Sequence, residues 1–172
     1  GEARFAALAA NLLQESAQIR NFAVSRGMVV TFVYPLEGNE KALGFDYSDS
    51  EGQREGTRRA RETGELVIAG PLDLIQGGRG IIGRFPVFVP EPDGATRFWG
   101  IVSAVVDIDR LYRDSGLDAA DLSIDIALSG HDGLGERGAL FHGSAATLAA
   151  DPVVAEVTLP SGAWRIAATP KG

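Results

Sequence analysis

Two apolar segments, Ile81–Val89 (IIGRFPVFV) and Phe98–Val106 (FWGIVSAVV), decide how this chain folds. Between them lies Pro90–Gly94 (PEPDG), a short sequence that is rich in turn-forming residues. Segments of this length with many β-branched and aromatic residues predict strands, and the connection predicts an antiparallel hairpin. The second segment is almost entirely apolar, so we expect it to lie in the middle of a sheet.

Upstream of this hairpin the sequence predicts two more strands and two short helices. The strands are expected over Met28–Tyr34 and Leu66–Ala69, and the helices over Asn39–Leu43 and Glu51–Glu62. Ser50 and Gln53 have the spacing of a capping box at the start of the second helix. Gly64 is suited to end that helix, because glycine tolerates the left-handed conformation found there.

The N-terminal residues, 2 to about 25, contain no proline and no glycine and predict one long helix. Phe5, Leu12 and Ile19 recur every seven residues and form an apolar stripe. Two arrangements satisfy this stripe. It packs on the domain's own sheet, or the helix forms a stalk that pairs with the same helix of a second chain.

The last sixty residues predict a smaller unit of mixed structure. A strand with alternating apolar residues is expected over Leu122–Leu128, and a compact hairpin around Pro160–Gly162. The predicted fold class is therefore α+β, with an antiparallel sheet, a long N-terminal helix and a smaller C-terminal α/β lobe. We expect three parts: a stalk helix over 1–26, a ligand-binding lobe over 27–112 and the smaller lobe over 113–172.

Charge and composition exclude several classes of function. The net charge of -7 argues against nucleic-acid binding, which requires a basic surface. The absence of cysteine excludes disulfides and cysteine-based zinc sites. The sequence has no run of 18 apolar residues, so we expect any membrane anchor to lie outside it.

Several short stretches, taken in order, resemble the CHASE domain, a sensory domain of membrane receptors. They are Tyr34–Glu40 (YPLEGNE) with Gly44–Asp46 (GFD), Arg59–Gly64 (RARETG), and Pro71–Gly80 (PLDLIQGGRG) running into Phe85–Phe88 (FPVF). The likeness extends from about residue 28 to the end of the chain. It implies a PAS-like fold with a membrane-distal ligand-binding lobe and a smaller membrane-proximal lobe.

The resemblance also implies a function for the parent protein. Domains of this family lie on the periplasmic or other extracytoplasmic side, between two transmembrane helices of a homodimeric receptor. They regulate a cytoplasmic histidine kinase, diguanylate cyclase or phosphodiesterase, and are not themselves enzymes. Plant members bind cytokinins through an acidic residue where this chain has Gln53, and carry a small hydroxyl residue where it has Arg84. The chain therefore resembles the bacterial branch more closely.

The segment from Pro71 to Val89 is the best candidate for a small-molecule pocket. Leu72, Leu74 and Ile75 supply an apolar wall, and Arg84 offers a fork of donors to a carboxylate or phosphate. Two alternatives remain for the Arg84 side chain: it faces solvent, or it pairs with an acidic residue of the protein itself. By the resemblance, Gln53 and Phe45 complete the expected ligand site, with no metal and no cofactor.

Two further hypotheses belong to other classes of function. His131, Asp132 and Glu136 lie in one glycine-rich loop and could form the site of a small hydrolase. This would require the three side chains to converge in one cleft. The N-terminal stripe could instead make the chain a structural dimerisation module.

Overall fold

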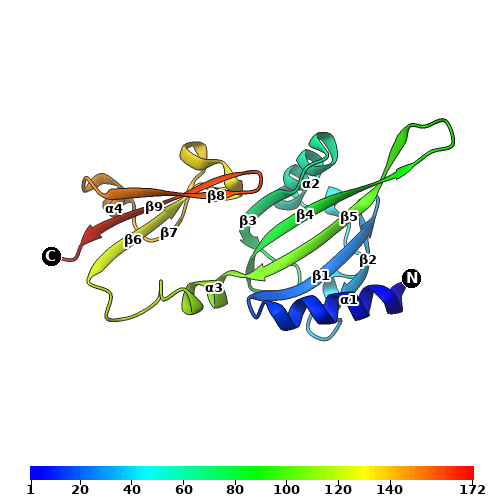
Figure 1. Ribbon diagram of the computed structural model, residues 1–172. Coiled ribbons are helices and arrows are strands. Elements are labelled where there is room, and N and C mark those ends of the chain that lie inside the picture. Colours follow the sequence, from blue (N-terminus) through cyan, green and yellow to red (C-terminus); the bar gives the residue numbers. More distant parts are fainter. The chain divides into compact units, whose positions relative to one another are not determined.

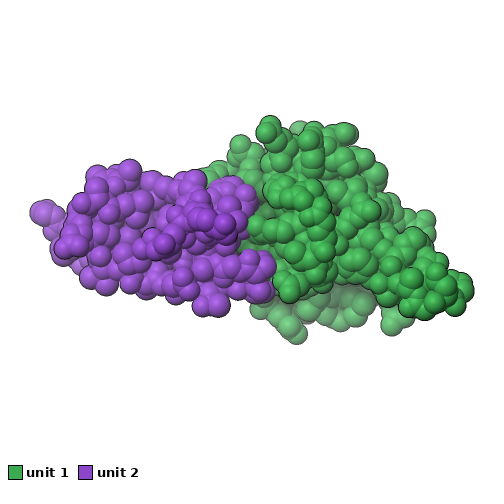
Figure 2. Space-filling model, turned by 90° about the horizontal axis from the view of Figure 1, so that it is seen from above, with its two compact units in different colours: residues 1–108 green, residues 109–172 purple.

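The computed structural model describes residues 1–172. The chain divides into two compact units, residues 1–108 and 109–172, which are coloured separately in Figure 2. Each unit contains one antiparallel sheet with helices, and this confirms the α+β class. The division falls between Ile108 and Asp109, four residues before the boundary that the sequence suggested.

Unit 1, residues 1–108, is built on a five-stranded antiparallel sheet (Figure 1). Its strands are β1 (Ile19–Arg26), β2 (Val29–Tyr34), β3 (Val67–Asp73), β4 (Arg79–Pro90) and β5 (Thr96–Asp107). Its helices are α1 (Glu2–Glu15) and α2 (Glu51–Thr63), with short 3-10 turns η1 (Glu40–Ala42) and η2 (Tyr47–Asp49). The order in space is β2-β1-β5-β4-β3, so β5 is the central strand, as its apolar sequence predicted.

The prediction of one helix over residues 2–25 is wrong. The helix α1 ends at Glu15, Ser16 is extended, and residues 19–26 form strand β1. The five consecutive residues 21–25 are all buried, because β1 is an inner strand of the sheet. A strand that is covered on both faces does not alternate between apolar and polar residues, and this removes the signal that distinguishes it from a helix.

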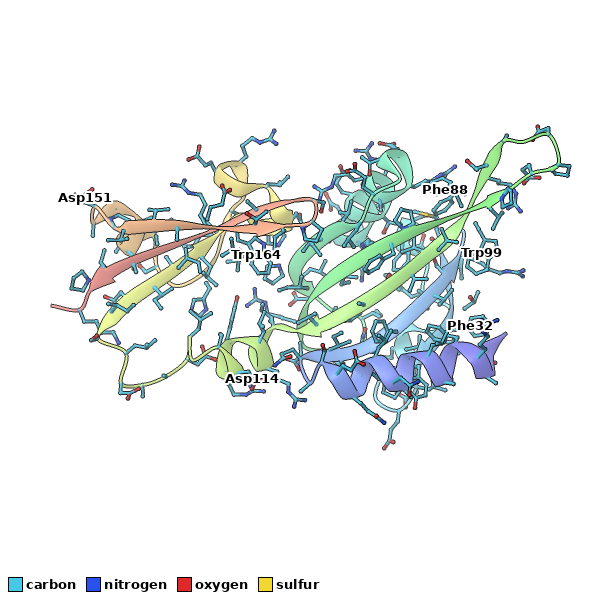
Figure 3. The ribbon with its side chains drawn as sticks, viewed as in Figure 1. Phe32, Phe88, Trp99, Asp114, Asp151 and Trp164 are labelled. Carbon is cyan, nitrogen blue, oxygen red and sulfur yellow. The ribbon has the colours of Figure 1, made fainter.

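Helix α1 packs on the domain's own sheet, but only part of the predicted apolar stripe takes part, because Leu12 is exposed and Ile19 belongs to β1. Phe5 lies against Phe32 of β2, with 6.3 Å between the ring centroids, and Ala9 is buried. Phe32 is labelled beside α1 in Figure 3. Leu8 and Leu12, on the same helix, remain exposed.

Helix α2 packs over the side of the sheet that contains β3 and β4 (Figure 1). Ala60 of α2 meets Val67 of β3 and Ile101 of β5 in a core cluster from which water is almost completely excluded. Near the hairpin, Phe88 packs edge-on against Phe98, with 5.7 Å between the centroids (Figure 3 labels Phe88). These contacts fix the helix on the sheet.

The two ends of α2 differ from each other in how well the sequence predicted them. Gly64 ends the helix in the left-handed conformation (φ 73°), and its N–H donates to the carbonyl of Ala60, as expected. The prediction of a capping box at the start of α2 is wrong. The Ser50 side chain makes no capping hydrogen bond, and the side-chain oxygen of the buried Gln53 accepts from Arg84 of β4.

Two glycine substitutions test this description of α2. Gly64→Ala is expected to lower the free energy of unfolding by about 1 kcal/mol, because a Cβ is unfavourable at positive φ. Gly52→Ala, at an exposed helical position of α2 with open space around it, is expected to raise it by roughly 0.5 kcal/mol. Urea unfolding of both variants checks the pair, and equal effects of the same sign would contradict the assigned helix end.

Unit 2, residues 109–172, contains a four-stranded antiparallel sheet in the order β7-β6-β9-β8. Its elements after α3 (Ile108–Asp114) are β6 (Ile124–Ser129), η3 (His131–Gly133), η4 (Gly135–Arg137), β7 (Leu140–His142), α4 (Ala145–Ala149), β8 (Val153–Leu159) and β9 (Gly162–Pro170). The predicted strand over 122–128 and the hairpin at 160–162 are confirmed. Trp164, labelled in Figure 3, packs edge-on against Phe141 in this unit.

Candidate ligand-binding site

A small cavity lies in unit 1, between the sheet and two segments that cover it, residues 42–53 and 74–76. Its volume is about 30 Å³. Strands contribute Asn21, Ala23, Val30, Ile82, Ser103 and Val105, and the covering segments contribute Ala42, Phe45, Tyr47, Gln53, Leu74, Ile75 and Gln76. The lining therefore combines apolar side chains with several polar ones, which is the composition of small-molecule sites.

Four of the six residues that the sequence singled out line this cavity. They are Phe45, Gln53, Leu74 and Ile75. Leu72 lies behind the wall, where it packs against the core cluster that contains Leu74. The sixth residue, Arg84, reaches the site through two of the lining side chains.

Arg84 is completely buried, so the reading that places it in solvent is wrong. Its Nη2 donates a hydrogen bond of 3.0 Å to Oε1 of Gln53. Its guanidinium carbon lies 4.7 Å from the ring centroid of Tyr47, in the geometry of a cation–π contact. A cation is thus held directly behind two residues of the cavity wall.

The sequence of α2 is adapted to this buried cation. The buried side of the helix consists of Gln53, Gly56, Thr57 and Ala60, which recur at helical spacing and are small or polar. A Cβ at Gly56 would lie 3.3 Å from Nε of Arg84 and 3.0 Å from Cβ of Ala69. Gly56 therefore leaves room for the guanidinium, and Gln53 supplies an acceptor to it.

Several polar residues of the site were missed from the sequence. Ser103 and Asn21 are buried with 1% of their surface exposed, and the Tyr47 hydroxyl is 3.1 Å from Oγ of Ser103. Asn21 accepts a hydrogen bond from Gln76 at Oδ1, while its Nδ2 has no hydrogen-bond partner. The signal for Ser103 was present, because Arg84 and Ser103 are the single polar residues of the apolar segments 81–89 and 98–106, and they pair directly in register.

A larger hollow, of about 710 Å³, lies in unit 2 and is lined by residues such as Asp125, Ser144 and Thr147. Asp125 is the only ionisable residue in its lining, whereas the cavity in unit 1 collects buried amides, hydroxyls and the adjacent cation. Convergence of buried polar groups marks a specific site better than volume does. We therefore place the candidate site in unit 1.

The loop of the hydrolase hypothesis does not form one cleft. Nδ1 of His131 lies 3.1 Å from Oδ2 of Asp132, but Glu136 is turned to Arg165, with 3.2 Å between Oε1 and Nη1. The side chain of Glu136 is 79% exposed. The chain contains no group of three or more His, Cys, Asp or Glu side chains placed to hold a metal ion. None of its helices has both the length and the apolar character needed to cross a bilayer.

Solved structures with the same fold include an extracellular receptor, the extracellular domain of a kinase and a sensor domain. An extracellular ligand-binding receptor from Desulfohalobium retbaense DSM5692 aligns with a TM-score of 0.69 at 19% identity, over 96% of this chain and 32% of that one. This chain therefore spans about a third of the length of that receptor chain. At this level of identity the likeness is one of fold.

Two histidine-kinase structures are also similar. The extracellular domain of rpHK1S-Z16, a protein assigned as a histidine kinase, has a TM-score of 0.62 at 14% identity, over 99% of this chain and 78% of that one. The sensor domain of the histidine kinase DctB from V. cholerae has a TM-score of 0.58 at 11% identity, over 98% and 78%.

Comparison at the level of sequence gives two results. No curated protein matches the sequence. The family model of the CHASE domain matches residues 2–142. The match covers well over half of the chain, and this chain belongs to the CHASE domain family.

Proposed function

We propose that this chain is the extracytoplasmic sensor domain of a transmembrane receptor, and that it binds a small anionic ligand, such as a carboxylate, in the unit 1 cavity. Ligand binding would regulate a cytoplasmic histidine kinase or a cyclic-di-GMP enzyme of the same polypeptide. The observation that carries the ligand class is the buried guanidinium of Arg84 behind Gln53 and Tyr47. Family membership and the extracellular sensor structures of the same fold support the sensory role.

The polar groups of the cavity suit a ligand that carries oxygen atoms. A planar guanidinium presents its donors in a fork that matches a carboxylate. Nδ2 of Asn21 is a buried donor without a protein partner, and such a group loses free energy unless something accepts its hydrogen bond. A ligand oxygen near Asn21 would accept the hydrogen bond of its Nδ2. A negative charge near Gln53 would lie close to the guanidinium of Arg84.

The size of the cavity indicates that binding requires movement. A volume of about 30 Å³ is close to the space of one water molecule. A carboxylate therefore fits only if the covering segments move outward, and the ligand then favours the open arrangement by its difference in affinity for the two states. A ligand-dependent shift between two arrangements is what a sensor requires.

We also propose that the parent receptor is a homodimer. Leu8 and Leu12 of α1 are exposed to 57% and 49% and leave an apolar surface on the outside of this helix. Exposed apolar residues on one helix suit pairing with a second copy.

Gln53→Glu is expected to remove the response of the protein to carboxylates. The introduced carboxylate would lie about where Oε1 of Gln53 accepts from Arg84, and would compete with a ligand for the same positive charge. The measurement is the unfolding temperature in a panel of acetate, pyruvate, L-lactate, succinate and L-glutamate, with acetamide as an uncharged comparison. We expect a rise with at least one carboxylate, and a loss of affinity of about tenfold or more in the variant.

Gly52→Glu is the matched control, because it adds the same charge one residue away on the exposed side of α2. It should respond to the panel as the wild-type protein does. A panel in which no carboxylate stabilises the wild-type protein, or in which Gln53→Glu responds undiminished, contradicts the anionic ligand.

A further inference from the structure

The segment Leu74–Gly78 connects β3 to β4 and forms one wall of the cavity. Leu74, Ile75 and Gln76 line it directly. The segment closes on itself through two hydrogen bonds, from Leu74 N to Gly78 O and from Gly77 N to Leu74 O, both 2.9 Å long. Beyond the buried side chain of Leu74, its tip is joined to the rest of unit 1 mainly through polar contacts of Gln76 and Gly77.

One side chain, Arg20, supplies two of these four contacts, both to backbone carbonyls of the segment. Its Nη1 donates to the carbonyl of Gly77 at 2.6 Å, and its Nη2 to the carbonyls of Gln76 at 3.4 Å and Gly38 at 3.1 Å. Its Nε donates to Oδ1 of Asn39 at 3.0 Å. A single guanidinium therefore ties the wall segment to the turn at residues 38–39.

A β-bulge in β1 aims Arg20 at this segment. Ile19 pairs with Val106 and Asn21 with Val105, so Arg20 is an extra residue without a partner in the ladder. Consecutive residues of a regular strand point to opposite faces, and a bulge breaks this alternation and redirects a side chain. As a result, Arg20 and Asn21 both hold Gln76, the first at its carbonyl and the second at its side-chain amide.

The hydrogen bonds of Arg20 determine which end of each side-chain amide in this network is oxygen and which is nitrogen. A guanidinium can only donate, so the atom of Asn39 that faces it is Oδ1, and Nδ2 of Asn39 donates to the carbonyl of Pro35. The atom of Gln76 that faces Oδ1 of Asn39 is therefore Nε2, which also donates to Oδ1 of Asn21. These two bonds of Gln76 are long, at 3.4 and 3.3 Å, and join neutral side chains, so they are weaker than the short bonds that the guanidinium donates to Gly77 and Asn39.

We propose that the segment Leu74–Gly78 is a lid over the cavity and that Arg20 is the latch that holds it closed. Opening breaks the bonds of Arg20 to Gln76 and Gly77 and the bonds of Gln76 to Asn21 and Asn39, and it exposes the polar groups of the cavity. Since Arg20 and Asn21 lie in β1, which follows α1, the state of the lid acts directly on this strand. The chemical class of the ligand that the lid admits rests on the proposed function, but the inference that the segment is a lid does not.

The natural absence of cysteine allows a direct test. Ser103→Cys places one thiol on the cavity wall at a position that is 1% exposed. Its reaction with methyl methanethiosulfonate, a small uncharged reagent, is followed by mass spectrometry in three proteins: this variant alone, and with Arg20→Ala or Arg20→Lys added. We expect Arg20→Ala to accelerate labelling about tenfold or more, because bonds to a charged donor are lost. Lysine lacks the guanidinium fork, so its rate should lie between the other two.

Two controls separate the lid from other causes. Arg58→Ala removes an arginine that bonds to Glu55 and Glu62 on the surface of α2, and should leave the rate unchanged. Ile101→Ala destabilises the core without touching the lid, and shows how much labelling global unfolding permits. Equal rates with and without Arg20, or an acceleration no greater than Ile101→Ala gives at the same loss of stability, would overturn the proposal. A protein that responds to carboxylates but labels independently of Arg20 keeps the sensory function and loses the lid.

Discussion

Arg84→Met is expected to weaken carboxylate binding strongly while leaving the free energy of unfolding unchanged or higher by up to about 2 kcal/mol. Burial of a guanidinium costs desolvation free energy, and an apolar side chain of similar volume does not incur this cost. Arg84 is completely buried, and Met is unbranched and fills irregular space well. The loss of a buried charged partner lowers affinity by roughly 30-fold or more.

Two measurements decide the role of Arg84. Urea unfolding gives the stability of the variant, and titration with the carboxylate that stabilises the wild-type protein most gives its affinity. Arg58→Met removes the same charge from an exposed site, where the side chain is 52% accessible, and should change neither quantity much. A large loss of stability in Arg84→Met with unchanged affinity would assign Arg84 to the core of the fold and remove the argument for an anion.

The hairpin β4–β5, helix α2 and the C-terminal hairpin could be predicted from the sequence because their signals are local. Apolar strands around PEPDG, and a glycine after a helical segment, require no knowledge of distant residues. Strand β1 could not be predicted in this way. Its residues 21–25 are buried between other parts of the fold, and burial on both faces makes a strand resemble a buried helix.

The candidate site shows the same limit at the level of single side chains. Arg84 was recognisable as a charge within an apolar strand, but its direction depends on its register with Ser103 of β5. Gln53 matched a local capping pattern, but its side chain binds the buried Arg84 and does not cap the helix. Asn21 could not be identified as a site residue, because it lies in β1, which the sequence predicted as part of a helix. Tertiary contacts override local preference most strongly where polar groups are buried.

Ile101→Ala is expected to lower the free energy of unfolding by about 3–4 kcal/mol, which reduces the ratio of folded to unfolded protein by roughly two to three orders of magnitude. Ile101 is completely buried at the centre of the sheet, where it contacts Ala60 of α2 and Val67 of β3. Its backbone N–H donates to Oγ of Ser25, so the strand is fixed on both sides and cannot easily collapse around the missing atoms. A site that cannot relax keeps a cavity and shows the full cost of the substitution.

Ile75→Ala is the matched control, because the same atoms are removed from a side chain that is 45% exposed. Its cost should be about 1 kcal/mol or less, since little apolar surface is lost from the core. Urea unfolding gives both values, and the difference between them measures how tightly α2 is held on the sheet through Ile101. If the two variants unfold alike, Ile101 does not hold α2 tightly on the sheet. The burial of Arg84 beneath α2, and the cavity beside it, would then not persist in solution.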